Sequence, residues 1–171
     1  MKQENQKKSF IKEDLLFLGL KIMIFVILLT VTFLFIFGIC RCNNDMMSPA
    51  FKDGDLAIYY RLQKEFQPTD TVVLEKNGET QVRRIIAGAG DTVNLTEEGL
   101  EINGYQQQEQ GIYTETFPCS DGITFPITVG KDEYFVLGDN RTSAKDSRIY
   151  GVVKKEEIKG TVITLLRRRG F

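Results

Sequence analysis

The sequence contains no histidine, and this absence excludes several kinds of chemistry. Among its 171 residues there are 0 His and 3 Cys. Without an imidazole, the chain cannot form a Ser-His-Asp triad, a Cys-His dyad or a His-ligated zinc site. Three cysteines are too few for a disulfide scaffold, so we interpret Cys40, Cys42 and Cys119 as independent thiols. Any acid–base chemistry must therefore use Lys, Asp, Glu, Tyr or Cys.

The chain also lacks an excess of charge of either sign. Its 22 Lys and Arg nearly balance 23 Asp and Glu, which gives a formal net charge of −1. Nucleic-acid-binding domains usually present a strongly basic surface. We therefore expect no nucleic-acid partner. The length indicates one domain with an appendage.

Charged residues are missing from a long apolar run near the N-terminus. Residues 22–40 form 19 consecutive uncharged positions, and a helix needs roughly 20 to cross a bilayer. Thr30 and Thr32 fit such a helix because their hydroxyls can bond to its own carbonyls. A cleaved signal peptide would have a shorter apolar core and a small-x-small site, and this run has neither. Because the run extends back to Leu15, we predict a retained transmembrane anchor over residues 15–40.

The distribution of positive charge predicts the orientation of this anchor. Four lysines lie within residues 1–14, whereas the 20 residues after the run carry only Arg41 and Lys52. Positively charged flanks remain on the cytoplasmic side. We therefore expect a cytoplasmic tail over residues 1–14 and an extracellular domain over residues 41–171. No second apolar run follows, which predicts a single-pass cell-membrane protein.

Residues 41–171 show the pattern of a mainly β domain. Short segments rich in β-branched and aromatic residues alternate with turn-forming pairs such as Asn77-Gly78 and Asn103-Gly104. The segments are 55–60, 71–75, 81–86, 91–95, 100–104, 133–138 and 161–166. The polar stretch 105–111 is typical of a loop or an edge strand. We predict a mainly antiparallel β domain of coiled sheets or a barrel. This pattern alone indicates no activity.

Three stretches carry more specific information. They are MMSPAFKDGD (46–55), VRRIIAGAGD (82–91) and GDNRTSAKDSRIYG (138–151). In this order, after an N-terminal anchor, they resemble the boxes of the type I signal peptidases, which are membrane-bound endopeptidases that remove signal peptides with a Ser-Lys dyad. The family patterns are S-M-x-P followed by G-D, K-R-V-I-G-x-x-G-D, and G-D-N-R-x-x-S-x-D-S-R. The resemblance covers most of residues 41–165 and implies the family's fold, without a cofactor or a metal.

The boxes depart from the family at the positions that carry its chemistry. The resemblance places the nucleophilic serine at Met46, the general-base lysine at Arg83, and the serine that orients this lysine at Ala144. Methionine has no hydroxyl with which to form an acyl-enzyme. Arginine stays protonated and cannot act as a general base. The resemblance therefore implies a signal-peptidase-like pseudoenzyme.

Two alternatives would make the protein an active peptidase instead. Shifting the first box by one residue puts Asp45 at the nucleophile position, but a carboxylate does not restore serine acyl transfer. Alternatively, Ser48 is a displaced nucleophile, with Lys52 or Lys145 as its base. The reacting atom would then move by several ångströms, and a misplacement of about 1 Å can cost about a hundredfold in rate. An active signal peptidase that uses Ser48 is thus the alternative function.

The third box keeps the residues that have a structural role in the family. The resemblance implies that Asp139, Asn140, Arg141, Asp146 and Arg148 tie the loop beside the active site. It also implies an ion pair between Asp146 and Arg148.

The resemblance further implies a groove that binds an extended peptide. Asp45, Met47 and Val82 would flank this groove, which adds a peptide strand through main-chain hydrogen bonds. Met47 and Val82 would line its apolar pockets, unless they simply pack in the core. Arg83 would pair with a carboxylate there, either Asp45 or an acid of the partner.

The resemblance also favours a biological role. Degenerate family members occur in streptococci and their relatives beside sortases and pilins, where they assist pilus assembly. This implies a membrane protein of a Gram-positive bacterium that acts as a chaperone-like accessory factor for a pilin or sortase. A membrane-tethered scaffold that no longer uses its groove is a third interpretation.

Overall fold

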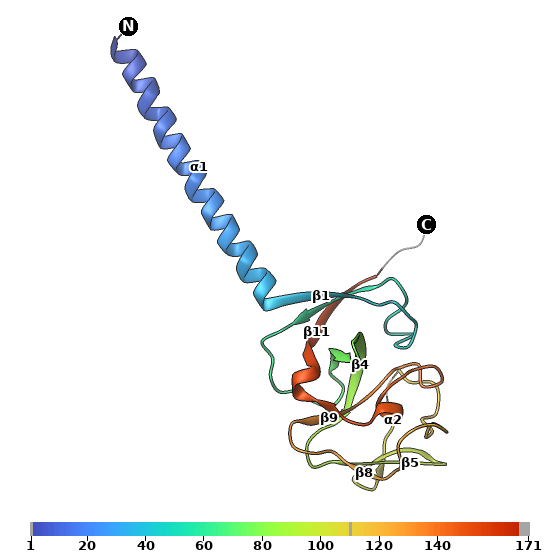
Figure 1. Cartoon of the computed structure of the whole chain (residues 1–171). Coiled ribbons are helices and arrows are strands. Elements are labelled where there is room, and N and C mark those ends of the chain that lie inside the picture. Colours follow the sequence, from blue (N-terminus) through green and yellow to red (C-terminus); the bar gives the residue numbers. More distant parts are fainter. Residues whose placement is uncertain (1, 110, 168–171) are drawn as a thin grey trace. The chain divides into compact units, whose positions relative to one another are not determined.

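The computed structural model describes residues 2–109 and 111–167, with side chains from residue 14 onward. The chain divides into a helical unit that ends at Phe37 and a second unit that begins at Gly38. The first unit is helix α1 (Lys2–Ile36) (Figure 1). Its segment Asp14–Ile36 has a mean hydropathy of 2.6, and none of it is buried inside the protein. A helix that is apolar on all sides and uncovered has the length and composition of a membrane span.

Two threonines inside this helix behave as the sequence predicts. The hydroxyl of Thr30 donates to the carbonyl of Val26, and that of Thr32 donates to the carbonyl of Leu28, each at 2.8 Å. Each hydroxyl therefore has a hydrogen-bond acceptor within the apolar helix.

The helix ends before the apolar run does, which corrects the predicted anchor boundary at residue 40. Phe37–Arg41 is strand β1, and alternate residues along it are buried. This alternation is the period of a strand with one covered face. A Cβ at Gly38 would collide with the ring of Tyr59. The last apolar residues of the run therefore pack against the second unit as part of its sheet.

The second unit consists of two β-sheets, which confirms the predicted mainly β fold. The remaining strands are β2 (Leu56–Tyr60), β3 (Thr71–Lys76), β4 (Glu79–Ala87), β5 (Thr92–Thr96), β6 (Gly99–Ile102), β7 (Tyr105–Gln106), β8 (Ile127–Thr128), β9 (Glu133–Leu137), β10 (Val153–Lys154) and β11 (Ile158–Leu166). The larger sheet has the order β1-β2-β11-β3-β4-β9-β10, and the smaller has the order β7-β6-β5-β8 (Figure 1). In the larger sheet, the neighbouring pairs β2-β11, β11-β3, β3-β4, β4-β9 and β9-β10 are all antiparallel. A short helix, α2 (Ser147–Tyr150), and a 3₁₀ turn, η1 (Lys155–Glu157), complete the unit.

Two of the hairpins follow directly from Asn-Gly pairs. Asn77 and Gly78 have φ angles of 54° and 79° and connect β3 to β4, while Asn103 and Gly104 have 56° and 81° and connect β6 to β7. A two-residue turn with two positive φ angles matches the twist of antiparallel strands, and Asn-Gly tolerates it at low cost. The polar stretch 105–111 accordingly begins as an edge strand.

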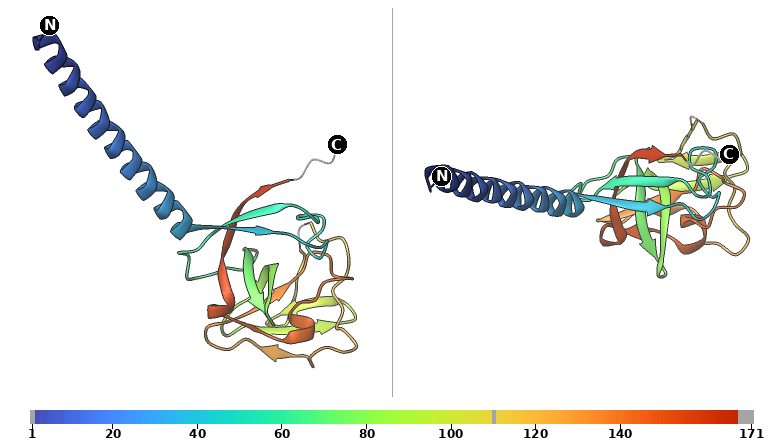
Figure 2. Two further views of the ribbon diagram at one scale, coloured as in Figure 1. Left: turned by 45° about the horizontal axis from the view of Figure 1, so that its top comes forward. Right: turned by 90° about the horizontal axis from the view of Figure 1, so that it is seen from above.

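Strands β3 and β4 are covered on both faces. Val72 and Ile85 belong to one apolar cluster, whereas Val73 and Val82 belong to another that includes Tyr59. A third cluster fills the space between the larger sheet and the smaller one, whose strands β5 and β6 are yellow-green in Figure 2. Burial on both faces explains the continuous apolar run in β3.

The loop 138–148, which leads from β9 into α2 and includes the first two residues of that helix, is fixed by a buried ion pair. Arg148 donates from Nε and Nη2 to the two carboxylate oxygens of Asp146, each at 2.9 Å. Asp146 Oδ2 also accepts from the backbone N–H of Gly138 at 3.1 Å, and Arg148 Nη2 donates to the carbonyl of Arg141 at 2.7 Å. The ion pair implied by the third box is thus present, and its hydrogen bonds join the two ends of the loop.

A second ion pair attaches this loop to β4. Arg84 donates from Nε to Asp139 Oδ1 at 2.8 Å and from Nη2 to Oδ2 at 2.6 Å. The hydrogen bonds to this carboxylate raise the pKa of Arg84. Arg141, also buried, contacts Glu109 and Thr116 and so holds the segment after β7. Charged side chains of the third box thus connect three parts of the second unit.

We expect Asp146→Asn to lower the free energy of unfolding of the second unit by about 3–5 kcal/mol, because the guanidinium of Arg148 would stay buried without its carboxylate. The matched control is Glu75→Gln, which removes the half-exposed partner of Lys159 and should cost at most about 1 kcal/mol. Denaturant titration of the full chain in detergent, followed by tyrosine fluorescence, measures both. Equal losses for the two variants would contradict a structural role of the buried pair.

Candidate functional site

The structure brings together the three positions that the boxes single out. Met46 lies in the loop after β1, Arg83 on β4, and Ala144 in the loop 138–148. Arg83 Nη2 approaches Met46 Sδ at 3.2 Å. Arg83 also donates from Nε and Nη2 to the carbonyl of Lys145, at 3.0 Å and 2.6 Å, and Lys145 directly follows Ala144. Segments that are far apart in the sequence therefore form one site.

Hydrogen bonds hold the loop around Met46 against the third box. The backbone N–H of Asn140 donates to the carbonyl of Met46 at 3.0 Å, and the Asn140 side-chain amide donates to the carbonyl of Asp45 at 3.3 Å. Gly138 allows this close approach, since a Cβ there would lie 2.6 Å from the carbonyl oxygen of Met46 and would also collide with Ala144. The position of Met46 is thus set by the loop 138–148.

The guanidinium of Arg83 is buried among neutral atoms. Its side chain is 2% exposed, and Nη1 donates to the carbonyl of Val82 at 2.6 Å. Within residues 14–109 and 111–167, no carboxylate forms an ion pair with it. Burial lowers the pKa of Arg83, while interactions with Tyr150, which include a side-chain hydrogen bond, and with the negative charges of Asp146 and Glu79 act to raise it. The site therefore holds a fixed positive charge that carbonyl dipoles solvate.

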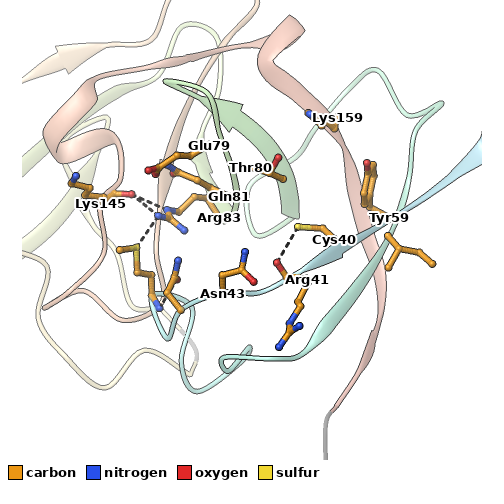
Figure 3. A pocket seen from close by; sticks show the side chains of 13 residues that line it. Cys40, Arg41, Asn43, Tyr59, Glu79, Thr80, Gln81, Arg83, Lys145 and Lys159 are labelled. Atoms are coloured by element: carbon orange, nitrogen blue, oxygen red, sulfur yellow. Dashed lines mark hydrogen bonds between the residues drawn. The ribbon is translucent and has the colours of Figure 1, made fainter.

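A cavity of about 720 Å³ opens beside this guanidinium (Figure 3). Strand β1 and the loop after it form one side, with Arg41 and Asn43, and the first half of β4 forms another, with Glu79 and Gln81. Its volume falls within the range of small-ligand sites, about 300–1,000 Å³. The walls are mainly polar, and cations outnumber acids among the residues that line it.

Few side chains around the cavity carry a hydroxyl or a thiol. They are the thiol of Cys40 and the hydroxyls of Tyr59 and Thr80. Burial raises the pKa of the Cys40 thiol, so the reactive thiolate is disfavoured. Ser48 is half-buried and does not line the cavity, and its backbone N–H donates to the carbonyl of Asp45 in a turn.

The two apolar groove residues pack in the core, which is one of the two alternatives that the sequence analysis leaves open. Met47 and Val82 are 3% and 5% exposed, and both belong to the core cluster beneath β1 and β2. They line a second, small cavity of about 30 Å³. Met47 Sδ accepts from the backbone N–H of Asp139 at 3.4 Å. Because β1 covers this face, neither side chain presents an apolar surface to a partner.

Asp45 does not form the expected internal ion pair with Arg83. Its Oδ1 accepts from the backbone N–H of Asp53 at 3.0 Å, so the carboxylate closes the loop on which it lies. Short polar side chains commonly make such local bonds to backbone N–H groups. The prediction of an internal ion pair is therefore wrong, and carbonyl groups solvate the charge of Arg83 instead.

Several cavity residues were missed by the sequence analysis. Arg41 was read only as a flanking charge and Lys145 only as a base for Ser48, whereas both line the cavity together with Lys159. The third box gave a signal for Lys145, since this residue lies between two of its defined positions. Nothing in the local sequence indicates that β1 and β11 place Arg41 and Lys159 at the same cavity.

Comparisons with known proteins identify one family. The family model described as "Signal peptidase, peptidase S26" matches residues 15–166. Signal peptidase I of Bacillus amyloliquefaciens is 33% identical over 171 residues, which cover 94% of this chain and 92% of that protein. Signal peptidase IB of Staphylococcus aureus is 30% identical over 170 residues, which cover 88% of each. A crystal structure of a signal peptidase I from Enterococcus faecalis is 30% identical, covers 59% of this chain and 98% of that one, and has a TM-score of 0.49.

The family match includes the apolar helix and all three sequence boxes of the second unit. The relatives align over nearly the full length of both proteins. The chain therefore belongs to the signal peptidase family, peptidase S26.

Proposed function

We propose that this chain is a non-catalytic member of its family that binds, but does not cleave, an extended peptide segment. The observation that carries the proposal is the contact of 3.2 Å between Met46 and Arg83, which occupy the positions that the sequence resemblance assigns to the serine and the lysine. The thioether has no proton to transfer and forms no acyl-enzyme. A guanidinium stays protonated and has no free lone pair with which to remove a proton.

Features of the backbone support peptide binding at the same place. Strand β9 pairs with β4 only from Arg84 to Ala87, so among the described residues the first half of β4 has β3 as its one partner strand. Strand β1 is the edge of the larger sheet. Both segments border the cavity of about 720 Å³. An extended peptide can use such open edges for main-chain hydrogen bonds.

The role that we propose is that of a chaperone-like accessory factor in pilus assembly, with a pilin or a sortase as partner. We place the chain in the cell membrane, spanning it once through Asp14–Ile36. Residues 1–14 are the cytoplasmic tail in this proposal, and the β unit is extracellular. The lysines before the helix and its uncovered apolar surface support this orientation.

The alternative is an active signal peptidase with Ser48 as a displaced nucleophile. Ser48 carries a hydroxyl near the family position, which favours this alternative. Against it, Ser48 lies outside the residues that line the cavity with Arg83, and neither Lys52 nor Lys145 forms a hydrogen bond to its hydroxyl in the described part of the chain. We therefore favour the non-catalytic function.

We expect the full chain, purified in detergent, to leave a signal-peptide substrate intact, because no activated nucleophile lies at the site. Mass spectrometry of the substrate after incubation measures cleavage directly, with signal peptidase IB of Staphylococcus aureus as the active control. Cleavage by the parent chain that Ser48→Ala abolishes and Met46→Ala leaves unchanged would establish the alternative.

Deleting this chain from a pilus-forming host should stop pilin polymerisation while signal-peptide processing continues. The physical reason is that a binding factor affects assembly of its partner, whereas the chemistry of processing resides in another peptidase. Immunoblots of cell-wall extracts measure both the pilin ladder and the precursors of exported proteins. Accumulation of precursors with a normal pilin ladder would contradict the proposal.

A further inference from the structure

We propose that the cavity beside Arg83 selects an extended peptide segment that carries an acidic side chain. This inference rests on the proposed peptide-binding function and names the chemistry that the site recognises. It differs from that function because it predicts which peptides bind.

The first observation is the charge at the base of the cavity. Arg83 is 2% exposed, and its hydrogen-bond partners are the carbonyls of Val82 and Lys145, the sulfur of Met46 and the side chain of Tyr150. Neutral dipoles solvate a cation but leave its net charge uncompensated. In a partly enclosed site, the attraction of such a charge for an anion is stronger than in water.

The second observation is the charge on the walls. Arg41, Lys145 and Lys159 line the cavity together with Arg83, and Glu79 is its one acidic residue. Lys159 is paired with Glu75. In the part of the chain that the structure describes, Arg41 and Lys145 form no ion pair, and both are exposed. The cavity thus carries an excess of positive charge, although the whole chain has a formal net charge of −1.

The third observation identifies the occupant as a peptide. The first half of β4 and the edge strand β1 border the cavity and leave backbone groups available for a further strand. A free phosphate or a lipid headgroup cannot pair with a row of backbone donors and acceptors, whereas an extended peptide has a matching row of its own. One carboxylate on that peptide would then enter a cavity whose lining includes the positively charged Arg41, Arg83 and Lys145.

Such a site differs from one that selects small apolar side chains. Its preference arises from charge complementarity, which governs specificity and association rate more than total affinity. Added salt should therefore weaken the preference, because exposed charges are screened over about 10 Å at 0.1 M ionic strength.

The test uses the full chain in detergent micelles and three fluorescein-labelled peptides of sequence STVTXTVTS, in which X is Glu, Gln or Lys. Fluorescence anisotropy at low salt measures the dissociation constants. We expect the Glu peptide to bind about tenfold more tightly than the Gln peptide, because its carboxylate would form two or three partly exposed charge pairs with the cavity. The Lys peptide should bind more weakly than either.

Variants assign the preference to the cavity. Lys145→Glu and Arg41→Glu should each remove most of the preference for Glu over Gln, without a loss of the folded state, because both side chains are exposed. The matched control is Lys131→Glu, which makes the same charge change at an exposed position outside the cavity. It should leave the preference unchanged.

Three outcomes would overturn the inference in different ways. Equal binding of the Glu and Gln peptides would contradict acid selection while leaving peptide binding intact. An equal effect of Lys131→Glu would show that overall charge, rather than the cavity, sets the preference. Binding of none of the peptides, together with tight binding of monomeric dioctanoyl phosphatidylglycerol that Lys145→Glu weakens, would identify a phosphate ligand and would also contradict the proposed peptide-binding function.

Discussion

The site depends on the buried ion pair between Asp146 and Arg148. This pair closes the loop 138–148 through the backbone of Gly138 and Arg141. The closed loop then supplies both the carbonyl of Lys145, which solvates Arg83, and the hydrogen bonds from Asn140 that position Met46. Pairing makes the burial of these two charges tolerable, and their additional hydrogen bonds satisfy the remaining donors and acceptors. A framework of charged residues is thus retained around positions whose reactive groups differ from the family pattern.

In our proposal an arginine, Arg83, stands where the family has a lysine, and this difference changes the chemistry that the site can perform. A buried lysine can lose its proton and become a neutral base, because desolvation disfavours its charged form. An arginine remains charged under the same conditions and must find acceptors instead. In this structure the carbonyls of Val82 and Lys145 serve as those acceptors. In our proposal, the same substitution that removes catalysis also provides a positive charge for recognition.

Much of the fold could be predicted from the sequence, because its signals are local. Asn77-Gly78 and Asn103-Gly104 form the turns that their conformational preferences favour, and the seven β-branched segments fall on strands. The end of the helix at Ile36 was not predicted, because apolar residues continue into β1 and only their packing against Tyr59 separates helix from strand. Likewise, the burial of Met47 and Val82 depends on β1 and β2 covering them, which no local pattern indicates.

The most direct test of the account restores the family's reactive groups in the existing framework. Cleavage of a signal-peptide substrate should be measured for the variant Met46→Ser/Arg83→Lys/Ala144→Ser and for a control that carries Met46→Ala with the same two other changes. Because positions 46 and 83 are in contact at 3.2 Å, we predict that the first variant cleaves at least about a hundredfold faster than the parent and that the control does not. Equal cleavage by the two variants, or none by the first, would contradict the claim that these positions form the family's reaction centre.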